Sequence, residues 1–200
     1  MKVNRKVVIG SGLLCFFFSI TGFAEEYSLQ YFLEKTSASS YELSKEERIE
    51  LLSGIGKVLG QVQEVRSRLS EAVQEGDGDI KYQEGKFWMS QLDQDQKSID
   101  SGFQQLKALK KKATNLVSEI KLYKSLKDLS FHFNSYNSLP AFSAYIGDIA
   151  PELELWADPV FYRLYLLPTA QAKSASPKPL LKKRRSGRQI DSVPSDKGEK

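Results

Sequence analysis

The sequence has almost none of the side chains that redox and metal chemistry require. Among its 200 residues are one cysteine, Cys15, and one histidine, His132. A single thiol cannot form an intramolecular disulfide, and one histidine without carboxylates at ligand spacing does not indicate a metal site. No segment has the alternating pattern of a strand, so no glycine-rich phosphate loop can follow one. We expect neither a disulfide scaffold nor a bound cofactor.

Long apolar runs are missing from the sequence except at its N-terminus. Three basic residues among the first six precede residues 7–24, which carry no charge. With small side chains at Gly22 and Ala24, this layout is typical of a secretory signal peptide, residues 1–24, cleaved after Ala24. The alternative is an uncleaved anchor, although eighteen residues lie at the short end of what spans a bilayer. We expect export to a bacterial periplasm, or attachment to the inner membrane if the signal is retained.

Charge is distributed unevenly behind the signal. Residues 25–172 hold 17 basic and 22 acidic residues, whereas residues 173–200 hold nine basic and three acidic ones. The polar, proline-containing segment 169–200 is predicted to be a disordered basic tail. Its basic cluster consists of Lys182, Lys183, Arg184, Arg185 and Arg188. The cluster could bind an envelope polyanion or anionic lipid, bind a protein, serve as a processing site, or only solubilise the chain. No aromatic residue interleaves with it, so nucleic acid is not favoured.

A first long helix is predicted over residues 45–75. Ser44 and Glu47 form a capping-box pair, in which each side chain satisfies a free backbone N–H at the start of a helix. Apolar residues then follow in steps of three and four, as in a coiled-coil seam. The turn-forming segment 76–79, Gly-Asp-Gly-Asp, should end this helix.

A second, longer helix is predicted over residues 86–133, because the same spacing continues and no proline occurs between Phe87 and Leu139. Only Asp95 and Gly102 interrupt its seam. Two striped helices joined by a short turn should pack as an antiparallel hairpin. The candidate helix–helix interface comprises Leu52, Ile55, Leu59, Val62, Leu106, Leu109, Leu116 and Ile120. The second helix would then outrun the first and leave seam surface free for a partner.

The aromatic-rich region 140–167 is predicted to form two or three short helices. Pro140 and Pro159 are placed where helices begin, Asp158 could cap the second of them, and Pro168 should end the last. The predicted fold is therefore all-α: one helical domain, residues 25–168, built on a long coiled-coil-like hairpin with short flanking helices and followed by the disordered tail.

Specific chemical sites are weakly indicated. Asp77 and Asp79 suggest a calcium loop, but the following residues lack its other ligands and its glycine, so a plain turn is favoured. His132 lies in an apolar neighbourhood without the partners of a catalytic triad. Gly56 and Gly60, four apart, could admit a close helix neighbour or mark a local break.

The function most consistent with these features is that of an exported structural or adaptor protein. It would bind a protein partner, or another copy of itself, through coiled-coil surface. A holdase-type periplasmic chaperone that grips unfolded proteins between helical arms is the alternative, followed by an inner-membrane-anchored component of an envelope assembly. An enzyme is less favoured, because its only support is an aromatic cluster that could line a pocket or fill a core. This cluster consists of Tyr136, Tyr145, Trp156, Tyr162 and Tyr165.

Overall fold

The computed structural model describes residues 27–38, 42–76 and 82–175, and these residues form helices and connecting turns without a strand. The helices are α1 (Leu29–Ser37), α2 (Lys45–Glu75), α3 (Tyr82–Lys111), α4 (Leu116–Asn137), α5 (Pro140–Ile146), α6 (Ile149–Leu155) and α7 (Leu167–Ala175), with a π-helical segment, η1 (Trp156–Leu166), between the last two. The predicted all-α fold is confirmed. The signal 1–24, the calcium-like turn 77–79 and the basic cluster of the tail lie outside the described residues.

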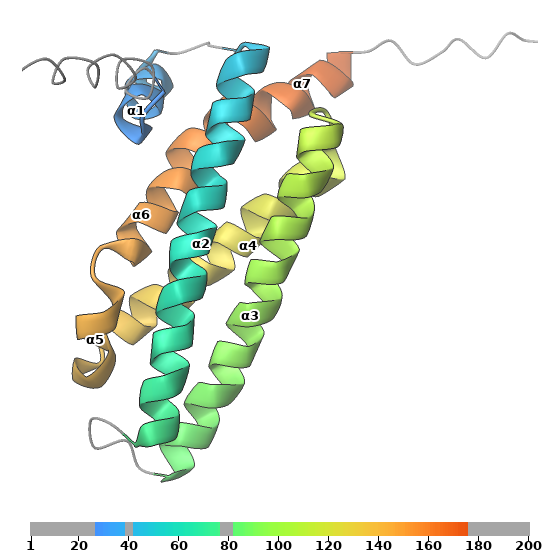
Figure 1. Ribbon diagram of the computed structural model, residues 1–200. Helices are drawn as coiled ribbons and strands as arrows, with labels where there is room; N and C mark the ends of the chain where they lie inside the picture. Colours follow the sequence, from blue (N-terminus) through green and yellow to red (C-terminus); the bar gives the residue numbers. More distant parts are fainter. Residues whose placement is uncertain (1–26, 39–41, 77–81, 176–200) are drawn as a thin grey trace, which may run out of the picture.

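Helix α2 follows its sequence signals closely. The Ser44 hydroxyl accepts a hydrogen bond from the Glu47 N–H at 3.2 Å, and the Glu47 carboxylate accepts one from the Ser44 N–H at 2.7 Å. The helix ends at Gly76, whose φ of 71° is the left-handed conformation that glycine adopts at helix C-termini. Helices α2 and α3 then run antiparallel, side by side (Figure 1), so the predicted hairpin is confirmed.

The second arm of the hairpin is shorter than predicted. Helix α3 ends at Lys111, and residues 112–115 form a turn in which the Asn115 side chain accepts a hydrogen bond from the Ser118 N–H and so caps α4. The single helix over 86–133 is therefore wrong. With 31 residues in α2 and 30 in α3, the arms match in length, and α4 folds back along α3 instead of extending beyond α2.

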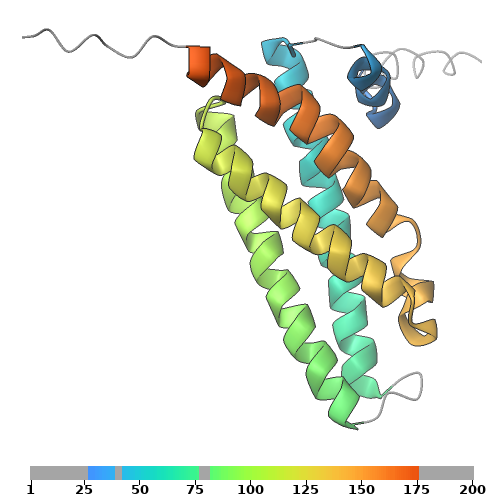
Figure 2. The ribbon, with the colours of Figure 1, turned by 180° about the vertical axis from the view of Figure 1, so that it is seen from behind.

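The C-terminal region also departs from the prediction. Residues 149–175 form one uninterrupted helical rod (Figure 2), with Pro159 inside its π-helical part rather than at a helix start. Proline lacks an N–H, and its ring crowds the preceding turn of an α-helix. The wider turns of the π-helical segment accommodate Pro159 within the rod. Pro168 does not end the rod, which continues to Ala175, well into the segment predicted to be disordered.

Helix α1 is attached beside the start of α2. The buried Phe32 packs near Trp156, and the Glu47 carboxylate pairs with Lys35 and accepts a hydrogen bond from Tyr31 at 2.6 Å. Burial raises the pKa of Glu47, but these hydrogen bonds and that from the Ser44 N–H outweigh it and hold the pKa at about 2. The carboxylate therefore stays ionised and ties α1 to the bundle.

The core lies between α2, α3, α4 and the rod, which surround it in the manner of a four-helix bundle. Two glycines permit close helix contact: a Cβ on Gly54 would overlap the Trp156 ring, and one on Gly102 would lie 2.8 Å from Leu59 Cδ1. None of the helices within the described ranges is long and apolar enough to cross a membrane.

Candidate functional site

The structure places the residues of the predicted helix–helix interface in two environments. Leu52, Ile55, Leu59, Val62, Leu106 and Leu109 are buried. Leu116 is half-buried, and Ile120 is 50% exposed. The turn at 112–115 changes the phase of the following helix, so α4 turns Leu122, Leu126 and Leu129 inward instead. The interface is therefore internal to the bundle.

A buried polar cluster occupies the point where Asp95 interrupts the seam. Asp95 is fully buried; its Oδ1 lies 2.6 Å from His132 Nδ1, and its Oδ2 accepts a hydrogen bond from the Tyr136 hydroxyl at 2.5 Å. Burial raises the pKa of Asp95, against the opposing effect of the hydrogen bonds from Tyr136 and His132. The cluster joins α3 to α4.

The chemistry available to this cluster is limited. The Gln91 amide nitrogen lies 3.3 Å from His132 Nε2, and no hydroxyl or thiol of the described residues is hydrogen-bonded to that nitrogen. A histidine held by a carboxylate but without a nucleophile or an open substrate position does not form an acyl-transfer site. We interpret the cluster as a polar clamp between two helices.

Most of the aromatic side chains that sequence suggested as a pocket lining lie in the core. Tyr136, Trp156 and Tyr165 are buried, Tyr145 packs partly against the core, and Tyr162 is 41% exposed. The Tyr165 hydroxyl donates a hydrogen bond to the Ala113 carbonyl oxygen at 2.8 Å, which fastens η1 to the turn between α3 and α4. These rings therefore hold the bundle together.

A third buried acid, after Glu47 and Asp95, lies near that turn. Glu119 on α4 is fully buried, and neither of its carboxylate oxygens has a hydrogen-bond partner among the described residues. Burial raises its pKa to about 7, against the influence of the Thr169 hydroxyl and the positive charges of Lys173 and Arg48. This end of the bundle therefore holds a group that changes charge near neutral pH.

An open groove of about 600 Å³ lies between α2 and α3, on the outer side of the hairpin. We call it the outer groove. Its lining residues are Ser53, Gly56 and Lys57 of α2 and Phe103, Leu106, Lys107, Lys110 and Lys111 of α3. Leu106 is almost fully buried at its floor, and the Phe103 ring is 38% exposed. All four lysines are exposed, and none forms an ion pair with a described residue.

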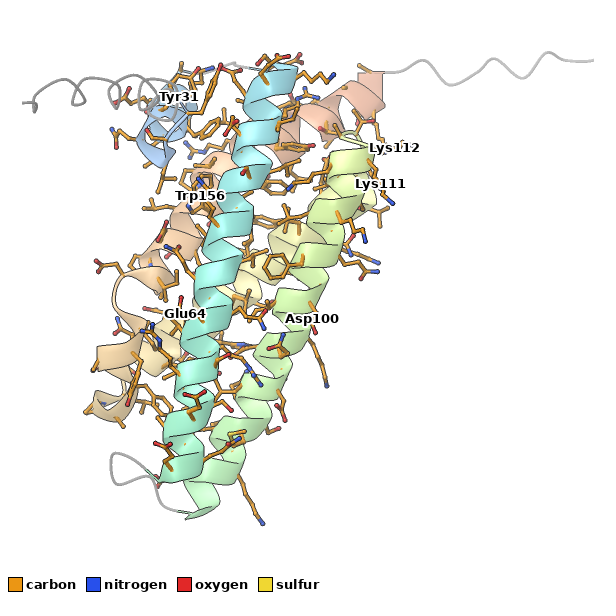
Figure 3. The ribbon with its side chains drawn as sticks, in the orientation of Figure 1. Tyr31, Glu64, Asp100, Lys111, Lys112 and Trp156 are labelled. Atoms are coloured by element: carbon orange, nitrogen blue, oxygen red, sulfur yellow. The ribbon has the colours of Figure 1, made fainter. Side chains whose placement is uncertain are left out.

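Acidic side chains of the hairpin lie toward both ends of the outer groove, and the exposed Glu46 and Glu50 occupy the first two turns of α2. Figure 3 shows Lys111 and Lys112 at the upper end of α3, whereas Asp100 on α3 and Glu64 on α2 lie lower on the hairpin. Between residues 101 and 127 there are seven lysines and a single acid, the buried Glu119. The α3 side of the outer groove is therefore positively charged, whereas the start of α2 carries Glu46 and Glu50.

Sequence reasoning did not find this groove. It noted Gly56 and Gly60 as positions for a close helix neighbour, but a Cβ on Gly56 would make only an ordinary contact, 3.7 Å from Leu106 Cδ1, and one on Gly60 would meet open space. The usable signal was the combination of these glycines with the lysines of α3, which only the antiparallel register of the hairpin brings together.

Comparison with known proteins found no matching family model, no similar curated protein and no similar solved structure.

Proposed function

We propose that the chain is an exported helical-bundle adaptor that binds a protein partner through the outer groove of α2 and α3. The observation that carries this proposal is the groove itself: the Phe103 side chain is 38% exposed beside the buried Leu106, and four exposed lysines border it. Exposed apolar surface bounded by polar side chains is typical of interaction sites. Export rests on the predicted signal 1–24.

The other side of the hairpin supports this choice of surface. Helix α2 packs there against α5, α6 and η1, and α3 packs against α4, so the inner side of the hairpin is occupied by the chain itself. An adaptor needs only one free face, whereas a holdase that grips clients between its arms needs the inner side to open. The adaptor is therefore the simpler proposal.

Site-specific photocrosslinking tests the proposal. A photoreactive phenylalanine analogue at Ser53, in the outer groove, should form a distinct protein adduct in the envelope of cells that export the chain. The same analogue at the exposed Gln94 of α3, away from the groove lining, is the matched control.

The variant Gly56→Trp should abolish the Ser53 adduct, because its ring would occupy the groove while its Cβ makes only the ordinary contact with Leu106. An adduct of twice the chain's own mass would identify self-association as the form of binding. Equal adducts from Ser53 and Gln94, or none from either, would refute the proposal.

A further inference from the structure

The floor of the outer groove is a furrow between two helices, into which a third helix could pack. Where two packed helices lie side by side, ridges of a third helix can fill the furrow between them. Gly56 places no side chain in this furrow, and Gly60, one turn further along α2, adds none. The lining of α3 runs from Phe103 to Lys111, roughly 12 Å at 1.5 Å per residue. About two turns of an apolar helix face would cover it.

The rim of the groove selects the charge of that helix. Lys57 borders it on α2, and Lys107, Lys110 and Lys111 border it on α3, all exposed and without ion-pair partners among the described residues. Four cations around an apolar floor favour a ligand with carboxylates beside an apolar stripe, through electrostatic complementarity. Acids limit this preference at both ends, because Asp100 lies three residues before Phe103 on α3 and the exposed Glu50 lies three residues before Ser53 on α2.

Charge also argues against the chain's own tail as occupant. Residues 173–200 hold nine basic and three acidic residues. Like charges at the rim would repel such a segment. The basic tail is therefore disfavoured as occupant, and an apolar floor between two helices suits an amphipathic helix of another molecule, the mode by which grooves of this kind recognise peptides.

We infer that the outer groove binds an amphipathic helix of a partner protein whose apolar stripe is flanked by acidic residues. The inference rests on the proposed adaptor function and specifies the chemistry of the partner. The apolar stripe covers Phe103 and Leu106, and carboxylates on the two flanks pair with Lys57 on one side and with Lys107 and Lys110 on the other.

A pair of synthetic helical peptides tests the inference. Both are about 14 residues long, roughly 20 Å, and carry the same apolar stripe; one has glutamates and the other lysines at the flanking positions. Binding to the full chain, as processed by the cell that expresses it, is measured by fluorescence anisotropy. We expect the acidic peptide to bind at least tenfold more tightly than the basic one, and its affinity to fall as salt screens the charges.

Charge reversal locates the binding site. The double variant Lys107→Glu with Lys110→Glu should weaken the acidic peptide at least tenfold and improve the basic one, because the rim changes sign. The control variant Lys97→Glu with Lys121→Glu changes the net charge equally at exposed positions outside the groove lining, and it should leave both affinities within about twofold of the original.

The remaining outcomes separate this inference from the proposed function. If both peptides bind equally well, or if the control variant loses as much affinity as the groove variant, the inference of an acidic helical ligand is wrong. If Gly56→Trp still removes the photocrosslinked partner, the adaptor function survives such a result. Loss of binding to phosphatidylglycerol vesicles in the groove variant, without any binding of the acidic peptide, would assign the lysines to lipid head groups and overturn the inference. Sedimentation showing a dimer that Gly56→Trp dissociates would assign the groove to a second copy.

Discussion

The two sides of the α2–α3 hairpin are built from the same two helices but differ in packing: the inner side is buried in the bundle and the outer side faces solvent. On the inner side, Leu59 of α2 is fully buried against Gly102 of α3, where a Cβ would lie 2.8 Å from its methyl carbon. On the outer side, Gly60 meets open space and Phe103 is 38% exposed. Substitutions at adjacent positions, such as Leu59 and Gly60, should therefore have very different effects on stability.

This contrast shows that the structural role of a glycine depends on which face of the helix it occupies. Gly54 and Gly102 are glycines because another side chain occupies the space of their Cβ, whereas a Cβ on Gly56 would make only an ordinary contact and one on Gly60 would meet open space. The first pair belongs to folding, and Gly56 of the second pair belongs to the surface that we propose for binding.

Truncation of a core leucine should have the largest effect. Leu59→Ala removes a fully buried side chain and should lower the free energy of unfolding by about 2–5 kcal/mol. Phe103→Ala, on the outer side of the hairpin, should cost about 1 kcal/mol or less, because the residue is already 38% exposed. Urea denaturation followed by circular dichroism measures both. Equal losses would mean that the outer floor belongs to the core.

The buried Glu119 should make stability depend on pH in the direction opposite to most acids. Its pKa is about 7 in the folded chain and near its ordinary 4.5 when unfolded, so the folded state holds the proton more tightly. Stability is then full below pH 4.5 and falls as pH rises through 7, by about 3 kcal/mol.

Glu119→Gln should flatten this fall, and the difference between the unfolding curves of the two proteins from pH 5 to pH 8 isolates the effect. The variant Glu64→Gln, at an exposed position of α2, is the control and should leave the slope unchanged. A slope identical in all three proteins would show that Glu119 is hydrated or paired in solution.

A methyl group at Gly54 should destabilise the bundle. The added Cβ of Gly54→Ala would overlap the buried Trp156 ring, and overpacking of this kind costs about 1–3 kcal/mol, partly offset by the better helix propensity of alanine. We expect a net loss of about 1–2 kcal/mol, measured by thermal unfolding. No loss would indicate that the Trp156 ring moves aside freely.

The same substitution at Gly60 should have the smallest effect and the opposite sign. Because a Cβ there meets nothing within 4 Å, Gly60→Ala gains helix propensity without a clash and should stabilise the chain by roughly 0.5–1 kcal/mol. Thermal unfolding of both alanine variants side by side gives the comparison directly. A destabilised Gly60→Ala would mean that a neighbouring segment already covers the outer face.

Part of the candidate site was accessible to sequence reasoning and part was not. The lysines of α3 and the paired glycines of α2 are visible along the chain, and the seam correctly assigned Leu106 to the hairpin. Their assembly into one groove depends on the register in which Gly56 lies opposite Leu106, fifty residues later in the sequence. Spacing within one helix carries no information about that register.

Local signals alone determined where α2 begins and ends, because the Ser44–Glu47 capping box and the left-handed Gly76 involve residues close together in the chain. Tertiary structure decided the break after Lys111, the continuous helix through Pro159 and the pairing of Asp95 with His132 and Tyr136. The physical reason is the same in each case. Near neighbours fix capping and helix phase, whereas burial and close packing depend on side chains that meet only when distant helices come together.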